Sequence, residues 1–184
     1  MSERPAPRAV APDGAETILR HWRDAVPNDR LAHLVKDATR ALVRALALRL
    51  AAHSVSFGHW TFLRILWERD GLTQRELSAE AGVMEPTTLA AVRAMEHAGY
   101  VTRRRKPDDR RSVYVYLTPA GRRLKRTLVP LAEQVNAIAV RGALEADITM
   151  MRRLLLAIIE NLARDEAQGA AAARGATRAH RRRR

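Results

Sequence analysis

The side chains best suited to chemistry are six basic residues clustered between positions 103 and 111. They are Arg103, Arg104, Arg105, Lys106, Arg110 and Arg111. The turn-forming sequence Pro107-Asp108-Asp109 interrupts them, and apolar and polar residues alternate from Ser112 to Leu117, which predicts a β-hairpin with its turn at residues 106–110. A protruding hairpin with this charge suits the phosphates of a nucleic acid better than the apolar face of a protein.

Two short helices are predicted just before this hairpin. Thr73 and Glu76 have the spacing of a capping box, which opens a helix, and Gly82 ends it. Pro86 in a first turn and Gly99 as a stop delimit the second helix, whose apolar residues are Leu89, Val92 and Met95. Two helices joined by a tight turn that contains glycine form a helix-turn-helix.

The order and spacing of these motifs resemble the multiple antibiotic resistance regulator (MarR) family over about residues 31–165. The matching residues are Gly71, Leu72, Thr73, Gln74, Glu76, Leu77, Gly82, Val83, Pro86, Thr87, Gly99, Asp109, Arg110, Arg111, Leu117, Thr118 and Gly121. The resemblance implies a mainly α (α+β) fold: a winged helix-turn-helix with a two-stranded β-hairpin wing and an all-helical dimerisation region from N- and C-terminal helices. It also implies an obligate homodimer that binds a pseudo-palindromic operator in double-stranded DNA.

The family resemblance implies that the second helix enters the major groove, with its first turn at the base edges. Its expected DNA-contacting residues are Glu85, Pro86, Thr87, Thr88 and Arg93, with Ala90 and Ala91 also exposed. This helix has few long donors, so indirect readout and the wing are expected to carry more of the specificity than usual.

Within the wing, Arg111 is expected to enter the minor groove beside Arg110, while the Asp109 carboxylate braces the tip. The other four basic residues, 103–106, are expected to hold phosphates without sequence preference. The alternative is a solvated loop whose charges only aid solubility.

A third feature is the junction Ser54 to Trp60, where the family resemblance implies a ligand pocket. An imidazole beside an indole, with cations nearby, suits a flat aromatic carboxylate. The expected ligand-binding residues are Arg40, Arg49, His53, Ser56, His59, Trp60 and Arg64. The alternative is that His59 bonds a helix end and that Trp60 belongs to the core.

The positive charge is localised. Of the net charge of +13, residues 103–126 supply +8 and residues 174–184 supply +6, so the rest of the chain sums to −1. Two basic patches are the footprint of a protein that binds a polyanion.

Several functional classes are excluded. With no cysteine, the chain has no disulfide, thiolate zinc site or cysteine-based peroxide sensor. The six histidines lack short ligand pairings, and we find no phosphate loop, nucleophile elbow or paired catalytic carboxylates, so we expect no metal, no cofactor and no enzyme. Neither a membrane-spanning run nor a signal-peptide core is present, so we predict a cytoplasmic protein without a membrane partner.

The expected organisation has five parts: a disordered arm (1–14), N-terminal dimerisation helices (15–54), the winged lobe (55–117), C-terminal dimerisation helices (118–166) and a basic disordered tail (167–184). The expected helices are 16–25, 31–53, 58–69, 119–142 with a kink or break at Pro130, and 145–165. The heavy apolar load of the terminal helices predicts burial against a second subunit. The tail is either a phosphate-binding arm or a solvated end.

We therefore predict a DNA-binding transcriptional regulator, a repressor released by a small aromatic or N-heteroaromatic carboxylate or its coenzyme A thioester, and controlling catabolic genes. Two alternatives are a ligand-independent architectural DNA-binding protein and an adaptor that uses the basic hairpin on an acidic protein.

Overall fold

The computed structural model describes residues 31–109 and 111–181, with side chains up to residue 170. The expected arm 1–14, the expected helix 16–25 and the site residue Arg110 lie outside the described residues. The elements, in chain order, are α2 (Leu31–Ala51), α3 (Phe57–Glu68), β1 (Leu72–Thr73), α4 (Gln74–Ala81), α5 (Glu85–His97), β2 (Val101–Arg104), β3 (Tyr114–Leu117), α6 (Pro119–Ala139) and α7 (Glu145–Arg181).

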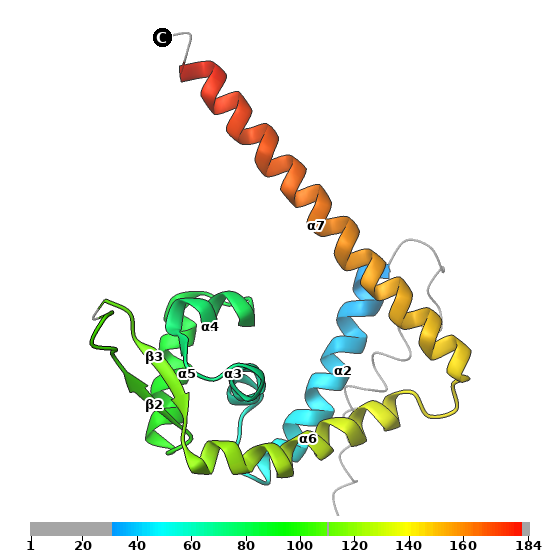
Figure 1. The fold of residues 1–184 in the computed structure, drawn as a ribbon. Helices are drawn as coiled ribbons and strands as arrows, with labels where there is room; N and C mark the ends of the chain where they lie inside the picture. The colour runs from blue at the N-terminus through cyan, green and yellow to red at the C-terminus, as the bar shows by residue number, and fades with distance from the viewer. Residues whose placement is uncertain (1–30, 110, 182–184) are drawn as a thin grey trace, which may run out of the picture. The chain divides into compact units, whose positions relative to one another are not determined.

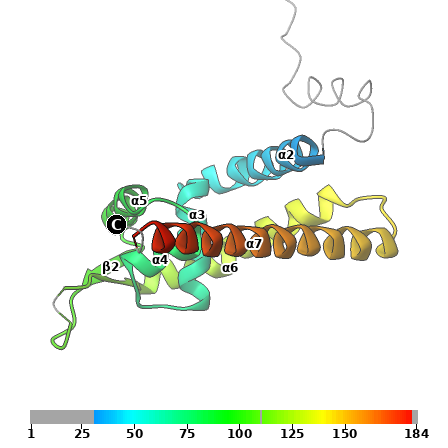
Figure 2. The ribbon, with the colours of Figure 1, turned by 90° about the horizontal axis from the view of Figure 1, so that it is seen from above.

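The fold is a winged helix-turn-helix, as expected, but its sheet has three strands. The order is β1-β3-β2 with both pairs antiparallel, and Leu72 of β1 lies opposite Val115. The strand β1 was not expected, because two residues are too few to show alternation. The hairpin made by β2 and β3 projects from the lobe on the side away from α2 in both views (Figures 1 and 2).

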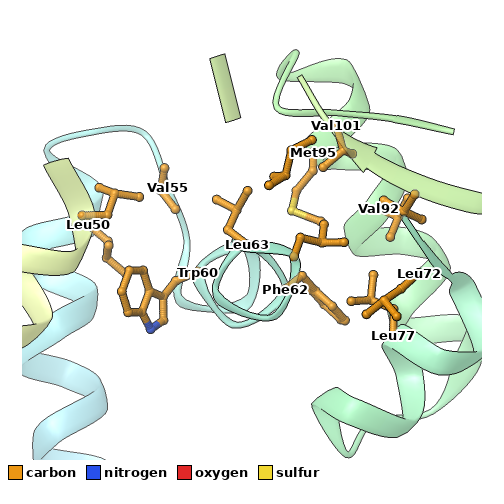
Figure 3. Close-up of a cluster of buried hydrophobic side chains, with 14 of the residues drawn as sticks. Leu50, Val55, Trp60, Phe62, Leu63, Leu72, Leu77, Val92, Met95 and Val101 are labelled. Carbon is orange, nitrogen blue, oxygen red and sulfur yellow. The ribbon is translucent and has the colours of Figure 1, made fainter. Parts of the chain in front are cut away.

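The core of the lobe is built around α3. Leu63 and Leu66 of α3 are fully buried, and Figure 3 shows α3 between two groups of side chains. One group, on the α2 side, includes Leu50 and Val55, and the other includes Leu77, Val92 and Met95 from the two helices of the motif. The DNA-binding helices are therefore fixed to the same core as α2, so the lobe presents them as a rigid unit.

Local signals set the helix starts as expected. Thr73 Oγ1 accepts from the backbone N–H of Glu76 at 3.1 Å, and the Glu76 carboxylate accepts from the backbone N–H of Thr73 at 2.8 Å, which completes the capping box. Gly82 has a φ of +63° at the end of α4, a left-handed conformation in which a side chain would be strained. This turn directs α5 away from α4.

The helix that follows the sheet, α6, was expected to kink or break at Pro130, and it does not break. Thr118 precedes α6, and its Oγ1 accepts from the N–H of Gly121 at 3.0 Å. The helix is continuous from Pro119 to Ala139, so Pro130 does not break it. A proline removes one hydrogen bond of the helix, and burial of Leu128 and Val135 on either side keeps the helix packed across that position.

Residues from Val140 onward form a second compact unit that contains α7. This helix has 37 residues and continues to Arg181, so the expected disordered tail is helical over most of its length. Alanines dominate residues 170–179, and alanine has the highest helix propensity, which explains the extension. Large apolar side chains are exposed along the helix: Met150, Met151, Leu154, Leu155, Leu156, Ile159 and Leu162. Over the ranges that the structure describes, no helix has both the length and the apolar character needed to cross a membrane.

Candidate DNA-binding site

The start of α5 presents a compact exposed surface. Met84 is the N-cap residue, makes no side-chain cap bond and is 76% exposed, and Glu85, Pro86 and Thr87 are exposed beside it. Pro86 lies in the first turn, where a fixed φ suits the helix and its missing N–H leaves no bond unmade. Further along the same helix, Ala90, Arg93 and His97 are exposed. Of these, Glu85, Pro86, Thr87, Ala90 and Arg93 were expected on the exposed face. Ala91 was also expected there, but it is half-buried and packs against the core.

Thr88 was expected to contact DNA, and this prediction is wrong because the side chain is fully buried. Thr88 Oγ1 donates to Ser78 Oγ at 3.1 Å, and Ser78 Oγ donates to the carbonyl of Val83 at 2.7 Å. This chain of bonds joins α4, the turn and α5 inside the core. The spacing of Thr88 with Val92 and Met95, at four and seven residues, was the available signal. By contrast Leu89, expected in the core, is only half-buried.

Asp109 braces the hairpin tip, as expected. Its Oδ1 accepts from the backbone N–H groups of Arg111 and Ser112, both at 3.1 Å, and its Oδ2 accepts from the Tyr114 hydroxyl at 3.0 Å. Hydrogen bonds, those from Ser112 first, hold the pKa of the Asp109 carboxyl below its usual range. The carboxylate is therefore charged at neutral pH and shapes the loop that carries the exposed Arg111.

Of the remaining basic residues of the hairpin, two are exposed to solvent and two contact another side chain. Arg104 and Arg105 are exposed, whereas the Lys106 Nζ lies 3.9 Å from the centroid of the Tyr114 ring, a cation–π contact. Arg103, which was expected to hold a phosphate, forms an ion pair in which its Nη2 lies 2.7 Å from Glu96 Oε2.

The Arg103–Glu96 pair connects α5 to β2. Arg103 also donates to Glu96 through Nε at 2.8 Å and through its backbone N–H at 3.1 Å. The hydrogen bond from the Arg103 side chain is the main reason that the pKa of Glu96 is lowered. Three bonds to one carboxylate set the orientation of the hairpin relative to α5, and sequence spacing across a turn gave no sign of them.

Three of the expected ligand residues, Arg40, Arg49 and His53, lie on α2 or directly after it. Arg40 is exposed and pairs with Asp37 at 3.4 Å, while Arg49 Nη1 donates to the Ala45 carbonyl at 2.8 Å. His53 is exposed at the end of α2. None of these three contacts the α3 residues of the expected site through a described bond.

The α3 members of the expected site have separate roles. Ser56 caps α3 by accepting from the His59 N–H at 3.1 Å, and the buried Trp60 makes an edge-to-face contact with Trp67, the two ring centroids 5.6 Å apart. Burial lowers the pKa of His59, whose Nδ1 is buried without a partner among the described residues.

Arg64 lies in a different place from the other expected ligand residues. It lines an open pocket of about 340 Å³ between α3 and α4 with four residues that the sequence analysis did not select. These are Ile65, Glu68, Arg69 and Glu80. Elsewhere in the part of the chain with described side chains, no cluster of three or more His, Asp or Glu is placed to hold a metal ion.

Comparison with known proteins places the site in context. Residues 55–113 match the model of the MarR family. The transcriptional regulator TtmR of Methylorubrum extorquens is 30% identical over 111 residues, which are 60% of this chain and 57% of that protein. The organic hydroperoxide resistance regulator of Bacillus subtilis is 23% identical, covering 73% of this chain and 90% of the relative. The homoprotocatechuate degradative operon repressor of Escherichia coli is 27% identical, covering 48% and 58% respectively.

Solved structures share the fold. A putative MarR family regulator from Listeria monocytogenes in complex with a 26mer DNA aligns with a TM-score of 0.68 and 22% identity, covering 74% of this chain and 91% of that one. BpsR of Bordetella bronchiseptica, whose DNA binding is regulated by 6-hydroxynicotinic acid, aligns with a TM-score of 0.65 and 22% identity, covering 71% and 98%.

Proposed function

We propose that this chain is a DNA-binding transcriptional regulator of the MarR family, whose model matches residues 55–113, and that it acts as a homodimeric repressor of catabolic genes. In this proposal its release from the operator follows binding of a small aromatic or N-heteroaromatic carboxylate, or the coenzyme A thioester of one. The regulator itself is not an enzyme, in keeping with the fold and the relatives.

One observation carries the proposal: the exposed first turn of α5 and the arginine-bearing hairpin are both fixed to one lobe. The exposed first turn of α5 is tied to α4 through Thr88, and the hairpin is tied to α5 through the Arg103–Glu96 pair. Asp109 then holds the loop that carries Arg111. A helix for the major groove and an arginine loop for the minor groove can therefore engage one half-site together.

Dimerisation is supported by apolar surface on the terminal helices, each taken by itself. Leu31, Leu34, Leu42 and Leu48 are exposed on α2, and a run of large apolar side chains is exposed on α7. Exposed apolar surface of this extent marks an interface. Two recognition helices must be held about 34 Å apart to enter successive major grooves on one face of DNA, and a two-fold dimer provides a fixed separation.

Support for the effector class comes from the junction and from the relatives. The His59 Nδ1 is buried and unpaired among described groups, next to Trp60, at the start of α3. One relative represses a homoprotocatechuate operon, and DNA binding by another is regulated by 6-hydroxynicotinic acid. We propose that an aromatic carboxylate favours a dimer with a different spacing of the recognition helices, and that operator affinity falls by the difference in ligand binding free energy between the two states.

The test is operator binding by the purified protein, measured by fluorescence anisotropy on its own promoter fragment and on random duplex at several salt concentrations. Arg111→Ala should weaken operator binding by about 1 to 3 kcal/mol at fixed salt, because it removes the minor-groove contact. The control is Arg44→Ala, which removes the same charge from an exposed position on α2. Hydroxybenzoates, cinnamates and pyridine carboxylates added to the complex should release the DNA.

Each other outcome identifies a different function. Equal affinity for operator and random duplex would indicate an architectural DNA-binding protein. Binding that is absent, or insensitive to salt, would indicate the protein adaptor, because phosphate contacts require a steep salt dependence. An operator complex that none of these acids dissociates would remove the proposed effector class while leaving the regulator intact.

A further inference from the structure

The exposed front of α5, which comprises Met84 to Thr87, carries one ionisable side chain, and that side chain is acidic. Between Met84 and Val92, Glu85 is the only charged residue, within a chain of net charge +13. We propose that Glu85 determines operator specificity by accepting a hydrogen bond from the N4 amino group of a cytosine in the major groove. This inference rests on the proposed DNA-binding function and names the base that this position selects.

Glu85 is held in a defined position but is not engaged. It is the first residue of α5, followed by Pro86, and the backbone N–H groups of Thr87 and Thr88 both bond to the Met84 carbonyl, at 3.0 and 3.1 Å. The buried bond from Thr88 to Ser78 fixes this turn to α4. Within the described residues, six ion pairs occur and Glu85 takes part in none of them.

An unpaired carboxylate is unfavourable at a DNA interface unless a base compensates for it. The phosphates repel it, and removing it from water without a donor costs free energy. The other residues of the exposed front, Met84, Pro86 and Thr87, provide no cation to neutralise it. With no cation available on this front, we infer that the compensating donor comes from the edge of a base.

The chemistry of the major groove ranks the four bases. Only cytosine N4 and adenine N6 present amino donors there, and guanine and thymine present acceptors or a methyl group. The adenine amino group lies between two acceptors, its own N7 and the O4 of the paired thymine. The cytosine amino group has an acceptor on one side only, the O6 of the paired guanine. A carboxylate is therefore repelled least at cytosine, and we expect the order cytosine, then adenine, then guanine and thymine.

A structural role for Glu85 makes a different prediction. An acidic residue in the first turn stabilises a helix through its interaction with the helix dipole. Loss of that interaction would change stability and would weaken binding to all sequences alike. A change in the preferred base at one position of the operator arises only if Glu85 contacts that base.

The experiment selects bound sequences from a random duplex library with the full-length protein and its variants. The unaltered protein should enrich a motif with one invariant cytosine in each half-site. Glu85→Ala should lose the preference at that position and keep the rest of the motif. Glu85→Gln should shift the preference to adenine, because an amide can bond both N6 and N7. Glu133→Ala is the matched control, since it removes an exposed carboxylate from α6.

Affinity measurements then quantify the effect at fixed salt. Replacing the cytosine by adenine in the operator should weaken binding of the unaltered protein by roughly tenfold, and should have no effect on Glu85→Ala. An identical motif and an identical penalty for the unaltered protein and Glu85→Ala would overturn this inference alone. An unaltered protein that enriches no sequence would overturn the proposed function and this inference with it.

Discussion

At the scale of single residues, Asp109 shows how an acidic group can promote binding to a polyanion. Its carboxylate accepts three hydrogen bonds within the hairpin, two of them from the backbone N–H groups of Arg111 and the residue after it. Electrostatic repulsion by phosphates alone would make this residue unfavourable. Its geometric role and its charge thus have opposite effects on DNA affinity, and the two are separable by substitution.

We expect Asp109→Ala to weaken operator binding by roughly fivefold to tenfold, the lower part of the range for removing one groove interaction. The neighbouring Asp108→Ala removes the same charge from an exposed residue and should bind DNA as tightly as the unaltered protein or more tightly. Anisotropy titrations of both variants at one salt concentration distinguish the two roles. Equal behaviour of the two variants would show that Asp109 contributes only its charge.

The pH dependence of this brace follows from the lowered pKa of Asp109. A carboxyl whose folded pKa is depressed contributes stability that is present above the ordinary carboxyl pKa of about 3.9 and is lost as pH falls through the folded value. The hairpin should therefore stay organised throughout the neutral and mildly acidic range.

At the scale of elements, the junction of α3, the hairpin and α6 depends on Gly121. A Cβ at this position would contact the Tyr100 carbonyl oxygen and the Leu117 side chain, and the Gly121 carbonyl accepts from Trp67 Nε1 at 2.9 Å. The first turn of α6 therefore packs directly against the backbone that leads into β2. Glycine is needed there because of close approach, since its φ is not in the left-handed region.

Gly121→Ala should lower the free energy of unfolding by about 1 to 3 kcal/mol, the usual cost of overpacking, because backbone must move. Urea denaturation followed by tryptophan fluorescence measures this directly, as Trp60 and Trp67 are in the lobe. The matched control is Gly169→Ala in α7, where a Cβ would meet nothing within 4 Å. That control should leave the transition of the lobe unchanged, and an equal destabilisation in both variants would contradict the packing argument.

At the scale of the whole molecule, the positive charge lies in two regions of the chain. One is the hairpin and the start of α6, and the other is residues 174–184 with six arginines and no acidic residue. The helix α7 continues to Arg181 and is about 55 Å long at 1.5 Å per residue. We propose that its basic end binds phosphates outside the operator contacts, so that it adds affinity without sequence preference.

Deleting residues 174–184 should flatten the dependence of the binding constant on salt, with the logarithmic slope reduced by about 0.9 for each phosphate that is no longer neutralised. The enriched operator motif should not change. A second variant with the six arginines replaced by glutamine keeps the chain length and should behave like the deletion. Unchanged salt dependence in both variants would show that this segment is a solvated end.

Much of the DNA-binding surface was predictable because its signals are local. The capping box of Thr73 and Glu76, the proline at position 86 and the aspartate of the hairpin tip all act on neighbours within a few residues. The order of these motifs also carried the resemblance to the MarR family, whose model matches residues 55–113. Such interactions do not depend on distant parts of the chain, so spacing alone is informative.

The errors concern contacts that connect separate elements. Thr88 was assigned to the exposed face because helical periodicity gives the direction of a side chain but not what covers it. The ion pair of Arg103 was missed because its partner Glu96 belongs to another element. The expected ligand residues were chosen from the family resemblance and from their chemistry, which do not show that folding places Trp60 in the core and Arg64 beside α4.

The sequence by itself determined where the helices of the lobe begin, which loop carries the arginines and which family the motifs resemble, since these follow from capping, turn chemistry and residue order. Only the tertiary structure decided which side chains of those segments are exposed and available to contact DNA. The physical reason is that a side chain becomes available or buried through packing and hydrogen bonds with residues of other elements, as Thr88 with Ser78 and Arg103 with Glu96 show.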